Sequence, residues 1–145
     1  MKSNITGKTS IEINASAEKV WKALTTPELI KQYFFNTNAV SDWKVGSSLT
    51  FSGEWQGKQY EDKGTILKSE TNKLFKYSYW SSMSGIEDKP ENYANITYEL
   101  TEHNNVTILT VIQENIPDEK MKAHSEENWK KVLEALKKLL ENKEK

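Results

Sequence analysis

The chain has 145 residues, of which 36% are hydrophobic and 28% are charged, and its formal net charge is −1. These values are typical of a globular protein, and we expect residues 1–145 to form one domain. The near-neutral charge argues against a nucleic-acid partner. The chain contains no cysteine and no arginine, which excludes disulfides and zinc–thiolate sites and removes the side chain that grips phosphate bidentately.

The first predicted elements are a strand and two short helices. Polar and apolar residues alternate over residues 6–14, which predicts a strand. Ser16 is placed to cap a helix over residues 17–26. Pro27 then opens a second helix, which we expect to end near Asn36.

Strands dominate the chain from about residue 40 onward, because short alternating runs are separated by turn residues. Five further strands are predicted, at residues 48–55, 60–70, 74–80, 95–100 and 106–115. Residues 81–92 form the longest predicted loop, and loops of this length are often functional. Consecutive strands joined by short turns predict an antiparallel sheet with one buried face.

Pro117 ends the last strand, and residues 118–142 are predicted to form one long amphipathic helix. Its apolar residues recur on one face: Met121, Trp129, Val132, Leu133, Leu136, Leu139 and Leu140. This face must lie on the sheet. The second half of the helix is aliphatic there and is expected to form closed core. The first half mixes Met, His, Ser, Asn and Trp, so any site is expected beneath it.

Four segments of the chain carry a resemblance to a known family: INASAEKVWKALTTPELIKQYF, GKQYEDKGTILK, YSYWSSMSGIEDKPENYANITYEL and HSEENWKKVLEALKKLLE. Together they resemble the START-like (SRPBCC) superfamily, in particular single-domain AHSA1-like members, the homologues of an activator of the Hsp90 ATPase. The resemblance spans roughly residues 10–142. It implies an α+β helix-grip fold, in which a curved antiparallel sheet of about six strands wraps around the C-terminal helix and encloses a cavity.

The resemblance leaves the function open, since members of this superfamily carry lipids or hormones, cyclise polyketides or assist Hsp90. We favour a non-catalytic protein that binds a small apolar or aromatic molecule. Two alternatives stay open: an activator of an Hsp90-type chaperone, and an enzyme resembling polyketide cyclases. The sequence contains no G-x-S-x-G, no H-E-x-x-H and no glycine-rich phosphate loop, which favours binding over catalysis.

The candidate ligand site combines inward-facing aromatic residues with a few polar ones, as ligand cavities commonly do. The predicted ligand-binding residues are Phe51, Tyr77, Tyr79, Met83, Tyr98, Gln113, His124, Asn128 and Trp129. Gln113 shares a face with Val111 and, if buried, needs a hydrogen-bond partner from a hydroxyl group or a ligand. The alternative interpretation is that the aromatic residues only fill the core of a small sheet.

The candidates for acid–base chemistry in the enzyme alternative are Asp62, a tyrosine hydroxyl and His124. Asp62 shares a predicted strand face with Gly64 and Ile66, so it either faces the cavity or lies in water at the strand end. No cofactor and no metal is expected, because the two histidines, His103 and His124, belong to different predicted elements.

The location is expected to be cytoplasmic. The first residues, MKSNITGKTSIEI, lack the apolar core of a signal peptide, and no run approaches the ~20 apolar residues of a membrane span. A monomer and a homodimer are both compatible with the sequence.

Overall fold

The computed structural model describes residues 5–34, 37–55, 57–81 and 87–143. In these residues it has seven strands and three α-helices. The strands form one sheet, in the spatial order β1 (Ile5–Ile13), β7 (Val106–Ile116), β6 (Ala94–His103), β5 (Leu74–Tyr79), β4 (Lys58–Glu70), β3 (Ser48–Trp55) and β2 (Asn38–Ser41). The helices are α1 (Ala17–Thr25), α2 (Pro27–Tyr33) and α3 (Glu119–Lys143). The fold is the expected α+β arrangement.

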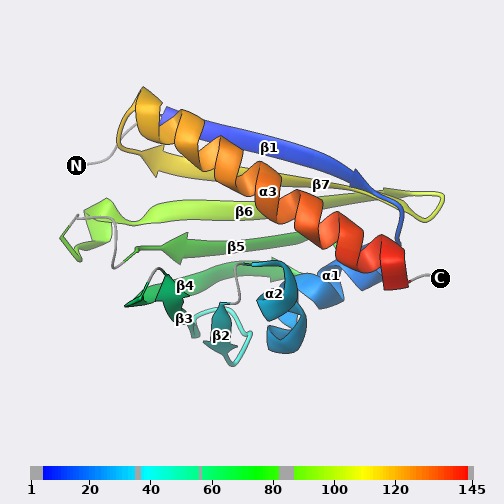
Figure 1. The fold of residues 1–145 in the computed structure, drawn as a ribbon, viewed down its shortest axis with the longest axis horizontal. Helices are drawn as coiled ribbons and strands as arrows, with labels where there is room; N and C mark the ends of the chain where they lie inside the picture. The colour runs from blue at the N-terminus through cyan, green and yellow to red at the C-terminus, as the bar shows by residue number, and fades with distance from the viewer. Residues whose placement is uncertain (1–4, 35–36, 56, 82–86, 144–145) are drawn as a thin grey trace.

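Every neighbouring pair of strands is antiparallel. The first strand pairs with the last, so β1 lies next to β7 and forms one edge of the sheet. Figure 1 shows α3 running diagonally across one face of the sheet, with α1 and α2 beside its C-terminal half. The core side chains lie between the sheet and the three helices.

The two short helices follow the predicted signals closely. The Ser16 side chain accepts a hydrogen bond from the Lys19 backbone N–H at 3.3 Å and so caps α1. Pro27 occupies the first turn of α2, where its missing N–H costs no hydrogen bond. These signals are local in the chain, which is why sequence alone could predict both helices.

The second half of α3 is closed core, as its apolar face predicts. Val132, Leu133, Leu136 and Leu140 are all buried against the sheet and the short helices. Trp129, one turn before them, is 9% exposed and ends this aliphatic row. The first half of α3 carries polar and exposed residues instead, and the cavity described below lies under it.

Two short elements were not predicted. β2 has four residues, of which only Ala39 is buried, so it shows no alternation that a sequence pattern could reveal. The 3-10 turn η1 (Pro90–Asn92) lies in the long loop. Within the described residues, no helix is long and apolar enough to cross a membrane.

A cavity between the sheet and the first half of α3

A cavity of about 690 Å³ lies between the sheet and the first half of α3. Its volume falls within the range of roughly 300–1,000 Å³ that is usual for small-molecule sites. Its apolar and aromatic walls come mainly from Phe34, Phe51, Tyr77, Tyr79, Trp80, Ala94, Ile96, Ile116, Trp129 and Val132. The rim includes Met121, which is 42% exposed, and the exposed side chain of His124.

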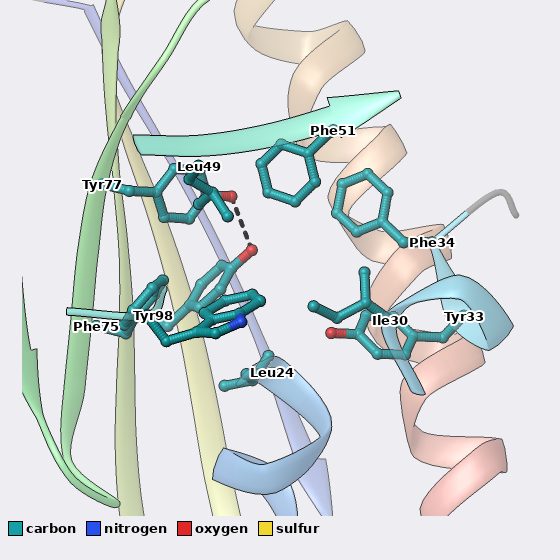
Figure 2. A pocket seen from close by; sticks show the side chains of 10 residues that line it. Leu24, Ile30, Tyr33, Phe34, Leu49, Phe51, Phe75, Tyr77 and Tyr98 are labelled. Atoms are coloured by element: carbon teal, nitrogen blue, oxygen red, sulfur yellow. Dashed lines mark hydrogen bonds between the residues drawn. The ribbon is translucent and has the colours of Figure 1, made fainter. Parts of the chain in front are cut away.

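A second, inner void has a volume of about 10 Å³, which is enough for one water molecule at most. Its lining comes from α1, α2 and the middle of the sheet: Leu24, Ile30, Tyr33, Phe34, Trp43, Leu49, Phe51, Phe75, Tyr77 and Tyr98 (Figure 2). The helices α1 and α2 thus fill this end of the space under the sheet. The large cavity is what they leave open at the other end.

Tyr98 belongs to this inner layer and not to the lining of the large cavity. Its hydroxyl lies 2.8 Å from the hydroxyl of Tyr77, and the two point toward each other in Figure 2. Its ring also meets Trp129 edge-on, with 5.9 Å between ring centroids. The structure therefore places Tyr98 one layer deeper than the sequence suggested, as a support for two residues that do line the cavity.

Seven of the predicted site residues line the large cavity together: Phe51, Tyr77, Tyr79, Gln113, His124, Asn128 and Trp129. The strand residues meet there because the register carries one inward row across the sheet, with Gln113 opposite Ile96 and Ile96 opposite Tyr77. His124, Asn128 and Trp129 come from the facing flank of α3. Met83 lies outside the described residues.

The wall formed by β7 and α3 is organised around Gln113. Its side-chain oxygen accepts hydrogen bonds from the Ser125 hydroxyl at 2.7 Å and from the Trp129 indole N–H at 3.0 Å. An indole N–H can only donate, so the amide oxygen must face Trp129 and the NH2 group must point elsewhere. Gln113 is half-buried, it has the hydroxyl partner that the sequence suggested, and its orientation is fixed.

The opposite wall is organised around Asp62 of β4. This carboxylate is only 8% exposed and accepts a hydrogen bond from the Tyr79 hydroxyl at 2.5 Å. Asp62 pairs across the sheet with Phe51 of β3, which places an aromatic ring beside it. Of the two positions open to Asp62 from its sequence, the structure therefore shows the buried one, on the cavity wall.

Tyr79 stays a hydrogen-bond donor over a wide pH range. Its burial and the neighbouring negative charge of Asp62 raise the pKa of the Tyr79 phenol well above its ordinary value. On the same side, the hydroxyls of Tyr60 and Thr37 lie 2.5 Å apart. This wall therefore presents a carboxylate held by a neutral phenol, inside an apolar surround.

Several lining residues were missed at the sequence level, notably Tyr60, Ala94, Asn115 and Ser125. Tyr60 has the same strand parity as Asp62 and could have been found from that signal. Ser125 was indicated only by its place in the polar first half of the helix, and its hydrogen bond to Gln113 could not be predicted, because Gln113 is twelve residues away in another element. No cluster of three or more potential metal ligands occurs within the described residues.

Residues 14–141 match the family model described as activator of Hsp90 ATPase homolog 1-like protein. The chain belongs to this family. No match was found among curated proteins. The AHSA1-like match covers α1, α2, nearly all of α3 and every strand except β1, and it includes every described residue that lines the cavity.

Solved structures agree with the AHSA1-like assignment. The solution structure of ChR145 from Cytophaga hutchinsonii is 47% identical, covers 99% of this chain and 98% of its own, and superposes with a TM-score of 0.84. The Aha1 dimer from Colwellia psychrerythraea is 23% identical, with 92% and 94% of the chains covered and a TM-score of 0.73. DynU16, from a dynemicin biosynthetic locus, is 17% identical, with 96% and 48% covered and a TM-score of 0.80. The last two likenesses show the fold alone.

Proposed function

We propose that this AHSA1-like domain binds a small, mostly apolar or aromatic molecule in the cavity beneath the first half of α3, and that it catalyses no reaction. One observation carries the proposal: a cavity of about 690 Å³ whose walls are mainly aromatic and aliphatic, with a few polar groups among them. Ligand sites in proteins have this composition, because apolar surface supplies affinity and sparse polar groups supply orientation.

The contrast between the side chains under the two halves of α3 supports the same proposal. Under the second half of α3 the side chains close the core, with Leu133 at 2% and Leu136 at 0% exposure. Under the first half the same helix leaves a space of ligand size. Natural interiors are close-packed, so a cavity this large with a partly polar wall suits an occupant other than protein.

A second candidate, acid–base catalysis of the cyclase type, is favoured by the hydrogen bond from Tyr79 to Asp62 inside the cavity. A buried carboxylate that a phenol holds in place can act as a general base toward a substrate that enters the cavity. A binding protein releases its ligand unchanged, whereas a cyclase does not, so mass spectrometry of the recovered ligand separates the two. The Hsp90-activator alternative draws on the family description alone.

The binding proposal is tested with the neutral apolar dye N-phenyl-1-naphthylamine, whose fluorescence rises in apolar surroundings. We expect saturable binding to the wild-type domain. An Ala94→Phe variant puts a ring into the cavity that Ala94 lines and should weaken binding at least about tenfold, which corresponds to about 1.4 kcal/mol.

The matched control is Ala123→Phe, which adds the same ring at an exposed position of α3 outside the cavity lining. It should bind the dye as the wild type does. Circular dichroism and thermal melting of each variant show whether it is folded. The proposal fails if the wild type shows no saturable signal, or if the Ala94→Phe and Ala123→Phe variants bind the dye equally well.

A further inference from the structure

We propose that the cavity selects a ligand with polar groups of opposite character at its two ends. The ligand presents a hydrogen-bond donor, a hydroxyl or a protonated amine, to Asp62. It presents an acceptor, a carbonyl or a carboxylate, to the amide NH2 of Gln113. This inference rests on the proposed binding function and adds the chemical class and the orientation of the bound molecule.

At the Gln113 end of the cavity, the amide offers N–H donors to a ligand, because its oxygen already accepts two hydrogen bonds. The amide oxygen takes two hydrogen bonds, from Ser125 and Trp129. No described residue accepts a hydrogen bond from the NH2 group, and no buried side-chain nitrogen or oxygen of the described residues lacks a partner. The NH2 group is therefore reachable from outside, and Gln113 lines the cavity. Two N–H donors on a fixed amide suit a ligand oxygen that accepts.

The Asp62 end offers an acceptor. An ionised carboxylate only accepts hydrogen bonds, and with about four acceptor sites it can take a donor from a ligand in addition to its protein partners, among them the Tyr79 hydroxyl on Oδ2. The side chain is 8% exposed and lines the cavity. A group that enters the cavity next to Asp62 meets a negative charge with Phe51 and Tyr79 nearby, and these rings also suit a cationic amine.

The charge on the cavity wall favours the same ligand orientation as the hydrogen bonds. Among the described lining residues, Asp62 is the one carboxylate, and Lys131 of α3 is the one lysine. Lys131 is exposed, so the charge that acts inside the cavity is that of Asp62. A ligand with an anionic or carbonyl end therefore meets unfavourable charge toward β4, which favours the same orientation as the hydrogen bonds.

The two ends are far enough apart to act on one elongated ligand. Gln113 lies on β7 and Asp62 on β4, with β6 and β5 between them. Three strand spacings separate the two strands by about 14 Å, and Asp62 lies four residues from Ile66, the residue of β4 in register with Gln113, which adds about 13 Å along the strand. On a flat sheet the two backbone positions are therefore about 19 Å apart. A rigid scaffold of two fused rings with polar groups at opposite corners can occupy the space between side chains that reach inward from both strands.

Four naphthalene probes test the inference: 6-hydroxy-2-naphthoate, which carries both groups; 6-methoxy-2-naphthoate, which has no donor; 2-naphthoate; and 2-naphthol. Their dissociation constants are measured by direct calorimetric titration and by displacement of N-phenyl-1-naphthylamine. With the wild type, 6-hydroxy-2-naphthoate should bind about tenfold tighter than the methoxy probe, because the methoxy group cannot donate to the Asp62 carboxylate. 6-(Aminomethyl)-2-naphthoate, whose alkyl amine is protonated at neutral pH, tests the cationic amine in the same position.

Two nearly isosteric variants test the Gln113 end and the Asp62 end of the cavity separately. Gln113→Glu keeps an oxygen for Ser125 and Trp129 but replaces the NH2 group with a second oxygen. It should weaken binding of both 2-naphthoate and the hydroxy probe about tenfold and leave 2-naphthol unchanged. Asp62→Asn keeps an oxygen for Tyr79 but loses the charge. It should abolish the preference for the hydroxy probe over the methoxy probe and leave 2-naphthoate unchanged.

The outcomes distinguish this inference from the binding proposal. If the neutral dye binds and is sensitive to Ala94→Phe, but the hydroxy and methoxy probes bind alike, the cavity binds ligands and this inference is wrong. It is equally wrong if Asp62→Asn keeps the hydroxy preference, or if Gln113→Glu binds naphthoates as the wild type does. If neither dye nor probe binds the wild type by either measurement, both proposals fall.

Discussion

The approach of β4 to β5 depends on one residue that has no side chain. A Cβ atom built on Gly64 would lie 1.6 Å from the carbonyl oxygen of Ser78, a backbone atom that cannot rotate away. Gly64 is two residues from Asp62 on the same strand, and Ser78 immediately precedes Tyr79. The close contact at Gly64 thus sets the spacing between β4 and β5, the strands that bring Asp62 and Tyr79 within hydrogen-bond distance.

Gly64→Ala should therefore lower the free energy of unfolding by about 3 kcal/mol, at the upper end for overpacking, because the backbones must separate. Gly7→Ala is the matched control. At Gly7 the nearest atoms are side-chain atoms of Ile116 and Glu126, at 3.2 and 3.3 Å, which can shift. It should change stability by less than about 1 kcal/mol, since alanine also reduces the entropy of the unfolded chain. Urea unfolding measures both, and equal losses would contradict the argument.

At the scale of elements, α3 covers the β1 edge of the sheet as well as one of its faces. Glu126 Oε2 accepts a hydrogen bond from the Lys8 backbone N–H at 3.0 Å, and Glu141 Oε2 accepts one from Asn14 N–H at 2.9 Å. Lys137 donates to the Glu12 carbonyl oxygen at 2.7 Å. An open edge strand invites pairing with other chains, and helix side chains here occupy backbone groups along β1.

Glu126→Ala should expose the Lys8 amide. We expect this N–H to exchange with deuterium about fivefold faster, because one hydrogen bond of about 1 kcal/mol no longer opposes its opening. Glu127→Ala is the control, since Glu127 is the neighbouring exposed residue of the same helix. NMR-detected exchange resolves the single amide. Similar rates for Lys8 in the two variants would show that the carboxylate does not protect the edge.

Sequence periodicity predicted those features that repeat along one element. The inward parity of Val111 and Gln113, and the division of α3 into an open and a closed half, follow from spacings of two and of about 3.6 residues. Features that depend on other elements were not accessible in this way. Tyr77 and Tyr98 both face inward, but only the packing of α1 and α2 decides that Tyr98 lines the inner void alone, whereas Tyr77 lines both spaces.

The same limit explains the polar groups of the cavity. Strand parity left two positions open for Asp62, because exposure at a strand end depends on what packs beside it. The partners of Gln113 lie 12 and 16 residues away in sequence, on a helix whose register against β7 is a tertiary property. Sequence therefore indicated which residues face the cavity, whereas their hydrogen bonds and depth required the structure.

At the scale of the whole molecule, the core is one connected set of aromatic rings. Ring contacts join Trp21, Phe34, Trp43, Phe51, Phe75, Tyr77, Tyr79, Tyr98 and Trp129. Its tyrosine hydroxyls are paired inside the protein: Tyr77 with Tyr98 at 2.8 Å, and Tyr79 with Asp62 at 2.5 Å. Tyr33 donates to the Ala23 carbonyl at 3.0 Å. The buried phenol hydroxyls thus join β4, β5 and β6 to one another and α2 to α1, while ring contacts such as that of Tyr98 with Trp129 join the sheet to α3.

These phenols make the fold sensitive to alkali. Burial is the main cause that raises the pKa of Tyr33, Tyr77, Tyr79 and Tyr98 above the ordinary value. The folded protein therefore keeps protons that the unfolded chain releases from about pH 10 upward. Their stabilising contribution is complete below that pH and is lost as the pH rises toward the folded pKa values.

Absorbance at 295 nm, which reports phenolate, should accordingly rise in two steps, with the second step coinciding with loss of the far-ultraviolet circular dichroism. Four of the six tyrosines should ionise only in that second, cooperative step, because they cannot release a proton while buried. Tyr77→Phe should remove one tyrosine from the second step and leave the first unchanged. A single step near pH 10 with native circular dichroism would mean that these hydroxyls are open to water, and that the aromatic core is looser than its contacts indicate.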